Sequence, residues 1–200
     1  MEENYRRYPI GIQNFEQLRN RNCVYVDKTA LVYKLANTDS VYFLSRPRRF
    51  GKSLLVSTLE AYFQGKKELF KGLAMESLEK DWTVYPVLHI DFSMTKYTEL
   101  ADLTGQLRIN LIRWEEIYGK GEGEIAPAER LNGIIRRAYE LTGKPVVVLV
   151  DEYDAPLLDS NSNLSLQREL RDEMRKFFSP LKGLGQYLRF LFLTGISKFS

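Results

Sequence analysis

The triplet Gly51-Lys52-Ser53 constrains the fold of this chain more than any other feature, because it stands between an apolar run and a helical segment. Residues 41–44 (Val-Tyr-Phe-Leu) predict a buried β-strand, and residues 54–60 predict the opening of a helix. The loop between them reads Arg-Pro-Arg-Arg-Phe over residues 46–50. A strand that runs through such a loop into a helix is a building unit of α/β folds.

The same segment predicts a phosphate-binding loop. It matches the pattern G-x-x-x-x-G-K-[ST] except at the first position, where Arg46 replaces glycine. Backbone N–H groups at the start of a helix have no partner within the helix and therefore suit an anion. Gly51 allows the backbone to approach phosphates, Lys52 supplies a charge for the β- and γ-phosphates, and Ser53 offers a hydroxyl to Mg²⁺. A basic loop that only caps a helix remains the alternative.

A second motif follows the apolar run 145–150, which reads Pro-Val-Val-Val-Leu-Val and ends in Asp151 and Glu152. Continuous apolar runs are typical of parallel strands covered on both faces, and ligands bind beyond the carboxyl ends of such strands. Asp151 can hold Mg²⁺ there, and Glu152 can orient or activate an attacking water. A strand that ends in ordinary polar turn residues would look similar. Both motifs together, each behind an apolar strand, predict a nucleoside triphosphate site.

With these motifs the chain resembles the AAA-ATPase-like family of bacterial and archaeal P-loop ATPases. The resemblance extends along nearly the whole chain and is carried by residues 8–11, 24–29, 46–53, 69–73, 85–93, 151–156 and 193–200. Arg46 matches the family's own version of the loop. The resemblance implies an α/β fold of the AAA or ASCE type, a three-layer P-loop NTPase sandwich with a mainly parallel central sheet flanked by helices. It also implies ATP and Mg²⁺ as cofactors and Mg²⁺-dependent ATP hydrolysis.

The combined interpretation assigns a role to each candidate site residue. We expect the nucleotide phosphates to be bound by Arg48, Arg49, Phe50, Gly51, Lys52 and Ser53. Ser53 and Asp151 are the expected Mg²⁺ ligands, and Glu152 and Lys52 are expected to act in catalysis. Thr194, at the exit of an apolar run at 188–193, is the expected sensor of the γ-phosphate, with Lys198 as a further contact.

Several residues keep two interpretations open. Either at least one of Arg46, Arg48 and Arg49 contacts the developing phosphate charge, or these arginines make only ordinary surface ion pairs. Asp27 either caps a helix that runs through Ala36 or lies near the nucleotide. Asp91 either approaches the site or is simply the polar end of a strand. His89 is the only histidine, which excludes a metal site with two histidines.

The remaining segments predict alternating strands and helices. Runs 86–91 and 188–193 predict two further strands of the sheet. The family resemblance implies that one strand is inserted between the runs 41–44 and 145–150. Apolar residues at helical spacing predict helices over 100–118, 128–141 and 165–181, and residues 158–163 predict a polar loop. We expect residues 1–40 to form a leader packed on a core of residues 41–200.

The resemblance also suggests partners. Family members commonly carry a C-terminal nuclease-like domain of the PD-(D/E)XK type, so we expect this chain to be a fragment that lacks a lid and that domain. The alternative function is then a nucleotide-gated regulatory or scaffold module that controls the absent domain without significant hydrolysis. A homo-oligomer, and nucleic acid bound only through the absent domain, stay open as further partners.

Composition gives no support to some classes of function. The chain has 29 basic and 26 acidic residues, and a net charge of +3 is too small to indicate nucleic-acid or membrane binding. One cysteine, Cys23, cannot form an internal disulfide and suits a reducing compartment. The sequence contains neither a signal-peptide pattern nor an apolar run near the ~20 residues that span a bilayer. We therefore expect a cytoplasmic protein.

Overall fold

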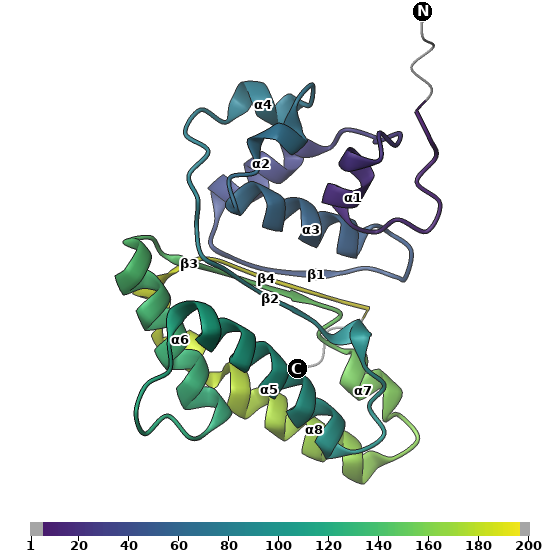
Figure 1. Cartoon of the computed structure of the whole chain (residues 1–200). Helices are drawn as coiled ribbons and strands as arrows, with labels where there is room; N and C mark the ends of the chain where they lie inside the picture. Colours follow the sequence, from purple (N-terminus) through teal and green to yellow (C-terminus); the bar gives the residue numbers. More distant parts are fainter. Residues whose placement is uncertain (1–5, 197–200) are drawn as a thin grey trace, which may run out of the picture.

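The computed structural model describes residues 6–196 and shows a central sheet between two layers of helices (Figure 1). The sheet has four parallel strands in the order β1 (Val41–Ser45), β4 (Leu188–Gly195), β3 (Val146–Asp151) and β2 (Val87–Asp91). The α/β fold with a parallel sheet is confirmed. The inserted strand is also confirmed, because β4 pairs with β1 on one side and with β3 on the other.

The helices divide between the two faces of the sheet (Figure 1). One face carries α1 (Phe15–Asn20), α2 (Thr29–Thr38), α3 (Lys52–Phe63) and α4 (Ala74–Leu78). The other carries α5 (Leu100–Tyr118), α6 (Pro127–Thr142) and α8 (Leu164–Phe178), with α7 (Ala155–Asp159) near the carboxyl ends of the strands. Short 3₁₀ helices complete the chain: η1 (Lys67–Phe70), η2 (Phe92–Met94), η3 (Ser179–Gly183) and η4 (Gly185–Tyr187).

Strand β3 forms the centre of the core because all six of its residues are buried. Val147 and Leu149 pack toward α3, whereas Val146, Val148 and Val150 pack toward α5, α6 and α8. A strand covered on both faces needs apolar residues at every position, which explains the continuous run in the sequence. The carboxylates that follow the run are thereby brought to the edge where the parallel strands end.

Strand β1 corrects one prediction. The run 41–44 was expected to be buried, but β1 is an edge strand and its residues alternate in exposure. Tyr42 and Leu44 pack on the α3 side, whereas Val41 is 59% exposed and Phe43 also lies at the surface. The apolar composition identified a strand correctly, but it did not indicate that only one of its faces is covered.

The predicted helices agree well with the structure, but α1 and α7 were not predicted. Helix α5 has the expected bounds, and α6 and α8 match their predicted segments within a few residues. The polar loop expected over 158–163 begins later, because α7 continues to Asp159. Pro156 in its first turn is compatible with a helix start, since the N–H that proline lacks would be unpaired there.

Candidate functional site

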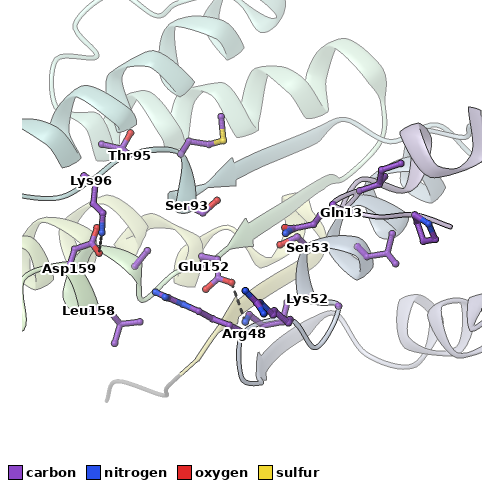
Figure 2. Close-up of a pocket in the computed structure, with 18 of the residues that line it drawn as sticks. Gln13, Arg48, Lys52, Ser53, Ser93, Thr95, Lys96, Glu152, Leu158 and Asp159 are labelled. Atoms are coloured by element: carbon purple, nitrogen blue, oxygen red, sulfur yellow. Dashed lines mark hydrogen bonds and ion pairs between the residues drawn. The ribbon is translucent and has the colours of Figure 1, made fainter. Parts of the chain in front are cut away.

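A cleft of about 1080 Å³ lies at the carboxyl end of the sheet and is shown in Figure 2. This volume slightly exceeds the roughly 300–1,000 Å³ typical of small-molecule sites. The cleft is lined by residues 9–13, by Arg48, Arg49 and 51–54, by residues 93–96, and by Glu152, Ala155, Leu158 and Asp159. Both sequence motifs therefore contribute to one cleft.

The first side of the cleft is the 46–51 loop, which connects β1 to α3. The Arg46 N–H donates to the Gly195 carbonyl at 3.0 Å, so the pairing of β1 with β4 extends into the start of the loop. Arg49 and Gly51 both have left-handed backbone, with φ of +67° and +74°. Gly51 adopts this conformation without the steric cost that a Cβ would add, and α3 begins at the next residue.

Lys52 connects the loop to the opposite side of the cleft. The residue is only 4% exposed, and its Nζ donates to the carbonyls of Arg46 at 3.0 Å and Pro47 at 3.3 Å. The same Nζ lies 3.1 Å from Oε1 of Glu152. A buried ammonium requires such partners, and these three contacts give its three N–H donors an acceptor each.

The second side is the acid turn, which we define as residues 151–154 after β3. The Thr194 hydroxyl donates to Oδ1 of Asp151, and the Glu152 N–H lies 3.1 Å from the same oxygen and 3.2 Å from the Thr194 hydroxyl. Glu152 itself has φ of +51°, a conformation that costs a residue with a Cβ about 1–2 kcal/mol. Such strain persists only where surrounding bonds impose it, and it is common at functional sites.

The acid turn is joined to the end of β4 by two further hydrogen bonds. The Tyr153 N–H donates to the Thr194 carbonyl at 2.8 Å, and the Ile196 N–H donates to Oδ2 of the fully buried Asp154 at 2.8 Å. Gly195 makes this approach possible, because a Cβ there would lie 2.8 Å from Oδ1 of Asp154. The exits of β3 and β4 therefore form one interlocked unit.

The charges that line the cleft favour an anion. Its cations are Arg48, Arg49, Lys52 and Lys96, and its carboxylates are Glu152 and Asp159. Glu152 is paired with Lys52, and Asp159 is paired with Lys96 at 3.0 Å. The two arginines are left as excess positive charge. Backbone N–H groups of the first turn of α3 add to it, since they have no partner within the helix.

The structure brings most of the predicted site residues together. Arg48, Arg49, Gly51, Lys52, Ser53 and Glu152 line the cleft. Asp151 and Thr194 are buried next to Glu152 and are absent from the lining. Phe50 is 63% exposed and also lies outside the lining. Lys198 lies outside the described residues.

Three further residues do not line the cleft, although Asp91 lies opposite Asp151 in the register of β2 and β3. Asp27 accepts hydrogen bonds from the N–H groups of Thr29 and Ala74, which connects the starts of α2 and α4 away from the cleft. Asp91 accepts from the Ser93 N–H at the end of β2. Burial acts to lower the pKa of His89, but the hydrogen bond and charge of Glu60, 3.0 Å away, outweigh it and raise the pKa.

Two stretches that line the cleft were not predicted from the sequence as site residues. Residues 9–13 contribute through a turn in which the Ile12 N–H donates to the Pro9 carbonyl at 3.2 Å. Residues 93–96 follow β2 and line the cleft beside α7, where Lys96 pairs with Asp159. The Pro-Ile-Gly sequence and the polar residues after β2 were the available signals, but neither indicates which surface it will face.

The described part of the chain shows neither a cluster of metal-binding side chains nor a membrane-spanning helix. Between residues 6 and 196, no three or more His, Cys, Asp or Glu side chains form a group that could hold a metal ion. None of the helices in that range combines the length and apolarity needed to cross a bilayer.

The parallel sheet with helices on both faces, and the loop and acid turn at its carboxyl end, define a P-loop NTPase-like protein. A family model agrees: residues 9–200 match the AAA-ATPase-like family, described as predicted AAA-ATPase, and the chain belongs to that family. It is also 40% identical over 197 residues to an uncharacterized protein in the vnfD 5′ region of Azotobacter chroococcum mcd 1. The match covers 98% of this chain but only 38% of that relative. No solved structure is significantly similar to the chain.

Proposed function

We propose that the cleft binds ATP with Mg²⁺ and hydrolyses it to ADP and phosphate. The observation that carries this proposal is the 3.1 Å contact between Nζ of Lys52 and Oε1 of Glu152, two residues far apart in the sequence. A cation suited to phosphate and a carboxylate suited to a water molecule therefore share one cleft. Phosphoryl transfer depends mainly on positioning and charge neutralisation, which such an arrangement supplies.

The phosphates would lie against the 46–51 loop and the first turn of α3. Lys52 is held at the cleft by the carbonyls of Arg46 and Pro47, and a phosphate would replace Glu152 as the acceptor of its third N–H. The family assignment to predicted AAA-ATPases supports a nucleotide as the ligand. ATP is our choice among nucleotides through that assignment.

The residues present fit a Mg²⁺ ion that is held partly by the nucleotide. Magnesium sites of this kind use one or two carboxylates together with phosphates and water, so a cluster of three acidic side chains is not required. Asp151 accepts its two hydrogen bonds on Oδ1, and within residues 6–196 no hydrogen bond to Oδ2 is found. Oδ2 of Asp151 and the hydroxyl of Ser53 would hold the ion, which when bound neutralises phosphate charge.

Glu152 would act as the base that takes a proton from the attacking water. Its N–H is held by Asp151 and Thr194, which fixes the start of the side chain, while the carboxylate reaches the cleft. Thr194 touches both acidic residues and would respond to the γ-phosphate through them. We therefore assign Thr194 a positioning role beneath the cleft.

A thermal shift measurement with Mg·ATP tests binding, and phosphate release tests hydrolysis. Ligand at ~100 times its dissociation constant adds roughly 2.7 kcal/mol to the free energy of unfolding. We expect Lys52→Ala to abolish the shift. Lys34→Ala, which removes an exposed lysine on α2, should leave the shift unchanged. Glu152→Gln should keep the shift and lose phosphate release.

The outcomes separate the two functions. Binding together with release that depends on Glu152 supports the enzyme. Binding without release in the parent protein supports the regulatory module instead. A shift that persists in Lys52→Ala means that the nucleotide binds elsewhere, which would overturn the proposal.

A further inference from the structure

We propose that Arg48 is a catalytic residue, supplying from within the same chain the positive charge that the γ-phosphate requires during transfer. This inference rests on the proposed ATP hydrolysis and adds a residue to it. Figure 2 shows the Arg48 side chain extending across the cleft past Glu152, toward the side where Leu158 lies. Arg46, in contrast, does not line the cleft.

The backbone around Arg48 is fixed although its side chain is exposed. Nζ of Lys52 binds the carbonyls of Arg46 and Pro47, the two residues immediately before Arg48. The Arg46 N–H is itself bound to the Gly195 carbonyl of β4. The backbone just before Arg48 is therefore anchored beside Lys52, and a phosphate held by Lys52 would be the partner that orients the exposed Arg48 side chain for electrostatic catalysis.

The guanidinium of Arg48 is also uncommitted. Among the described residues, Arg48 forms no side-chain hydrogen bond or ion pair. The carboxylates that line the cleft are already engaged, Glu152 with Lys52 and Asp159 with Lys96. Lys96 is a useful contrast, because its charge is offset by Asp159 and its side chain is 84% exposed. Arg48 keeps its full charge for a ligand.

The chemical step balances with water as the only co-reactant. The water oxygen forms a bond to the γ-phosphorus, and the bond from that phosphorus to the β,γ-bridging oxygen breaks, leaving its electron pair on ADP. Glu152 accepts the proton released by water. Negative charge on the bridging and γ-oxygens has to be neutralised, and a planar guanidinium can bond two of these oxygens at once.

The expected signature is a loss of turnover with little loss of binding. Arg48→Ala should lower kcat about 10²- to 10³-fold, as removal of a single preorganised donor does elsewhere. The dissociation constant for Mg·ATP should change by less than about threefold, because the contact is strongest in the transition state. Arg48→Lys keeps the charge and loses the planar fork, so its kcat should lie between that of the parent and that of Arg48→Ala. The matched control is Arg108→Ala, which removes an exposed arginine of α5 outside the cleft.

Two measurements complete the test. Binding of ADP with aluminium fluoride, which mimics the transferring group, should be tighter than binding of ADP alone in the parent, and this gain should vanish in Arg48→Ala. Mixing Arg48→Ala with Lys52→Ala asks whether the arginine acts within one chain. If it does, no activity returns, because no single chain has both residues.

Three results would overturn the inference: unchanged kcat in Arg48→Ala, no gain from aluminium fluoride in the parent, or activity restored on mixing. Failure of the underlying function looks different, since the parent protein would then show no thermal shift with Mg·ATP at all. The analogue measurement keeps the role of Arg48 testable even if turnover of the parent is slow.

Discussion

The two sides of the cleft are built in opposite ways. Every residue of the 46–51 loop is exposed, and its shape depends on Lys52 and on one hydrogen bond to β4. The acid turn, residues 151–154, begins and ends in buried residues and is bound to residues 194–196 through both backbone and side chains. The acid turn is therefore rigid before a ligand arrives, whereas the 46–51 loop presents unpaired charge.

Under the proposed function, this difference would give each side a separate task. Carboxylates that handle a metal ion and a water molecule must be placed accurately, and buried hydrogen bonds hold them in place. Arginines that meet a highly charged anion gain more from being accessible, since the anion supplies their partner. Substitutions in the acid turn should therefore reduce stability, whereas substitutions of the loop side chains should reduce activity at little cost in stability.

The largest expected loss of stability comes from Asp154→Ala. This change removes a fully buried carboxylate and leaves the Ile196 N–H without its acceptor, so the free energy of unfolding should fall by about 3 kcal/mol. Urea unfolding of the parent and the variant measures this difference in free energy. Asp81→Ala, at an exposed aspartate, should cost less than about 0.5 kcal/mol. Equal losses in the two variants would mean that the acid turn is not the rigid side.

Gly195→Ala should be the next most damaging change. The new Cβ would lie 2.8 Å from Oδ1 and 3.0 Å from Cγ of Asp154, an overlap that should cost about 2 kcal/mol. In the Asp154→Ala background the clash is absent, so the cost of Gly195→Ala should shrink by at least about 1 kcal/mol. Additive losses in a double-mutant cycle would show that the two residues do not interlock.

Thr194→Val tests the hydroxyl that joins β4 to both acidic residues. Valine has nearly the same shape but cannot donate to Asp151 or accept from the Glu152 N–H, so we expect a loss of about 1–2 kcal/mol. Phosphate release should fall as well, because Glu152 loses one of its two anchors. Thr194→Ser keeps the hydroxyl and should recover most of both properties. If valine and serine behave alike, the hydrogen bonds contribute little.

The fold could be predicted from the sequence because its signals are local. A continuous apolar run at β3, apolar residues at helical spacing in α5 and a glycine after α6 each identify an element without information about its neighbours. Exposure of Val41 in β1 could not be predicted, because it depends on which helices cover the edge of the sheet. Helix α7 was missed since five residues give too short a pattern to show a helical period.

The candidate site was predictable to the same extent. Lys52 and Glu152 belong to motifs whose residue types indicate their chemistry, and the structure brings the two residues together. The contributions of Pro9 and Lys96 arise only when distant segments fold onto the same cleft. The bond between Asp154 and Ile196 likewise depends on two strands being neighbours in the sheet, which no local pattern specifies.

The smallest predicted effect concerns the backbone of the loop side. Arg49 has φ of +67°, where a residue with a Cβ pays about 1–2 kcal/mol relative to glycine. Glycine avoids this cost, but its greater freedom in the unfolded chain offsets part of the benefit. Arg49→Gly should therefore be more stable than Arg49→Ala by about 0.5–1 kcal/mol. Denaturant unfolding of both variants measures the difference.

Arg108 provides the control, because it is also exposed but lies inside helix α5. There the order should reverse, with glycine about 1 kcal/mol less stable than alanine. A reversed sign between the two positions would show that the loop keeps its left-handed turn without help from the side chain of Arg49. If alanine is better at both positions, the loop takes another path on substitution, and Lys52 with the hydrogen bond to β4 does not fix its left-handed turn.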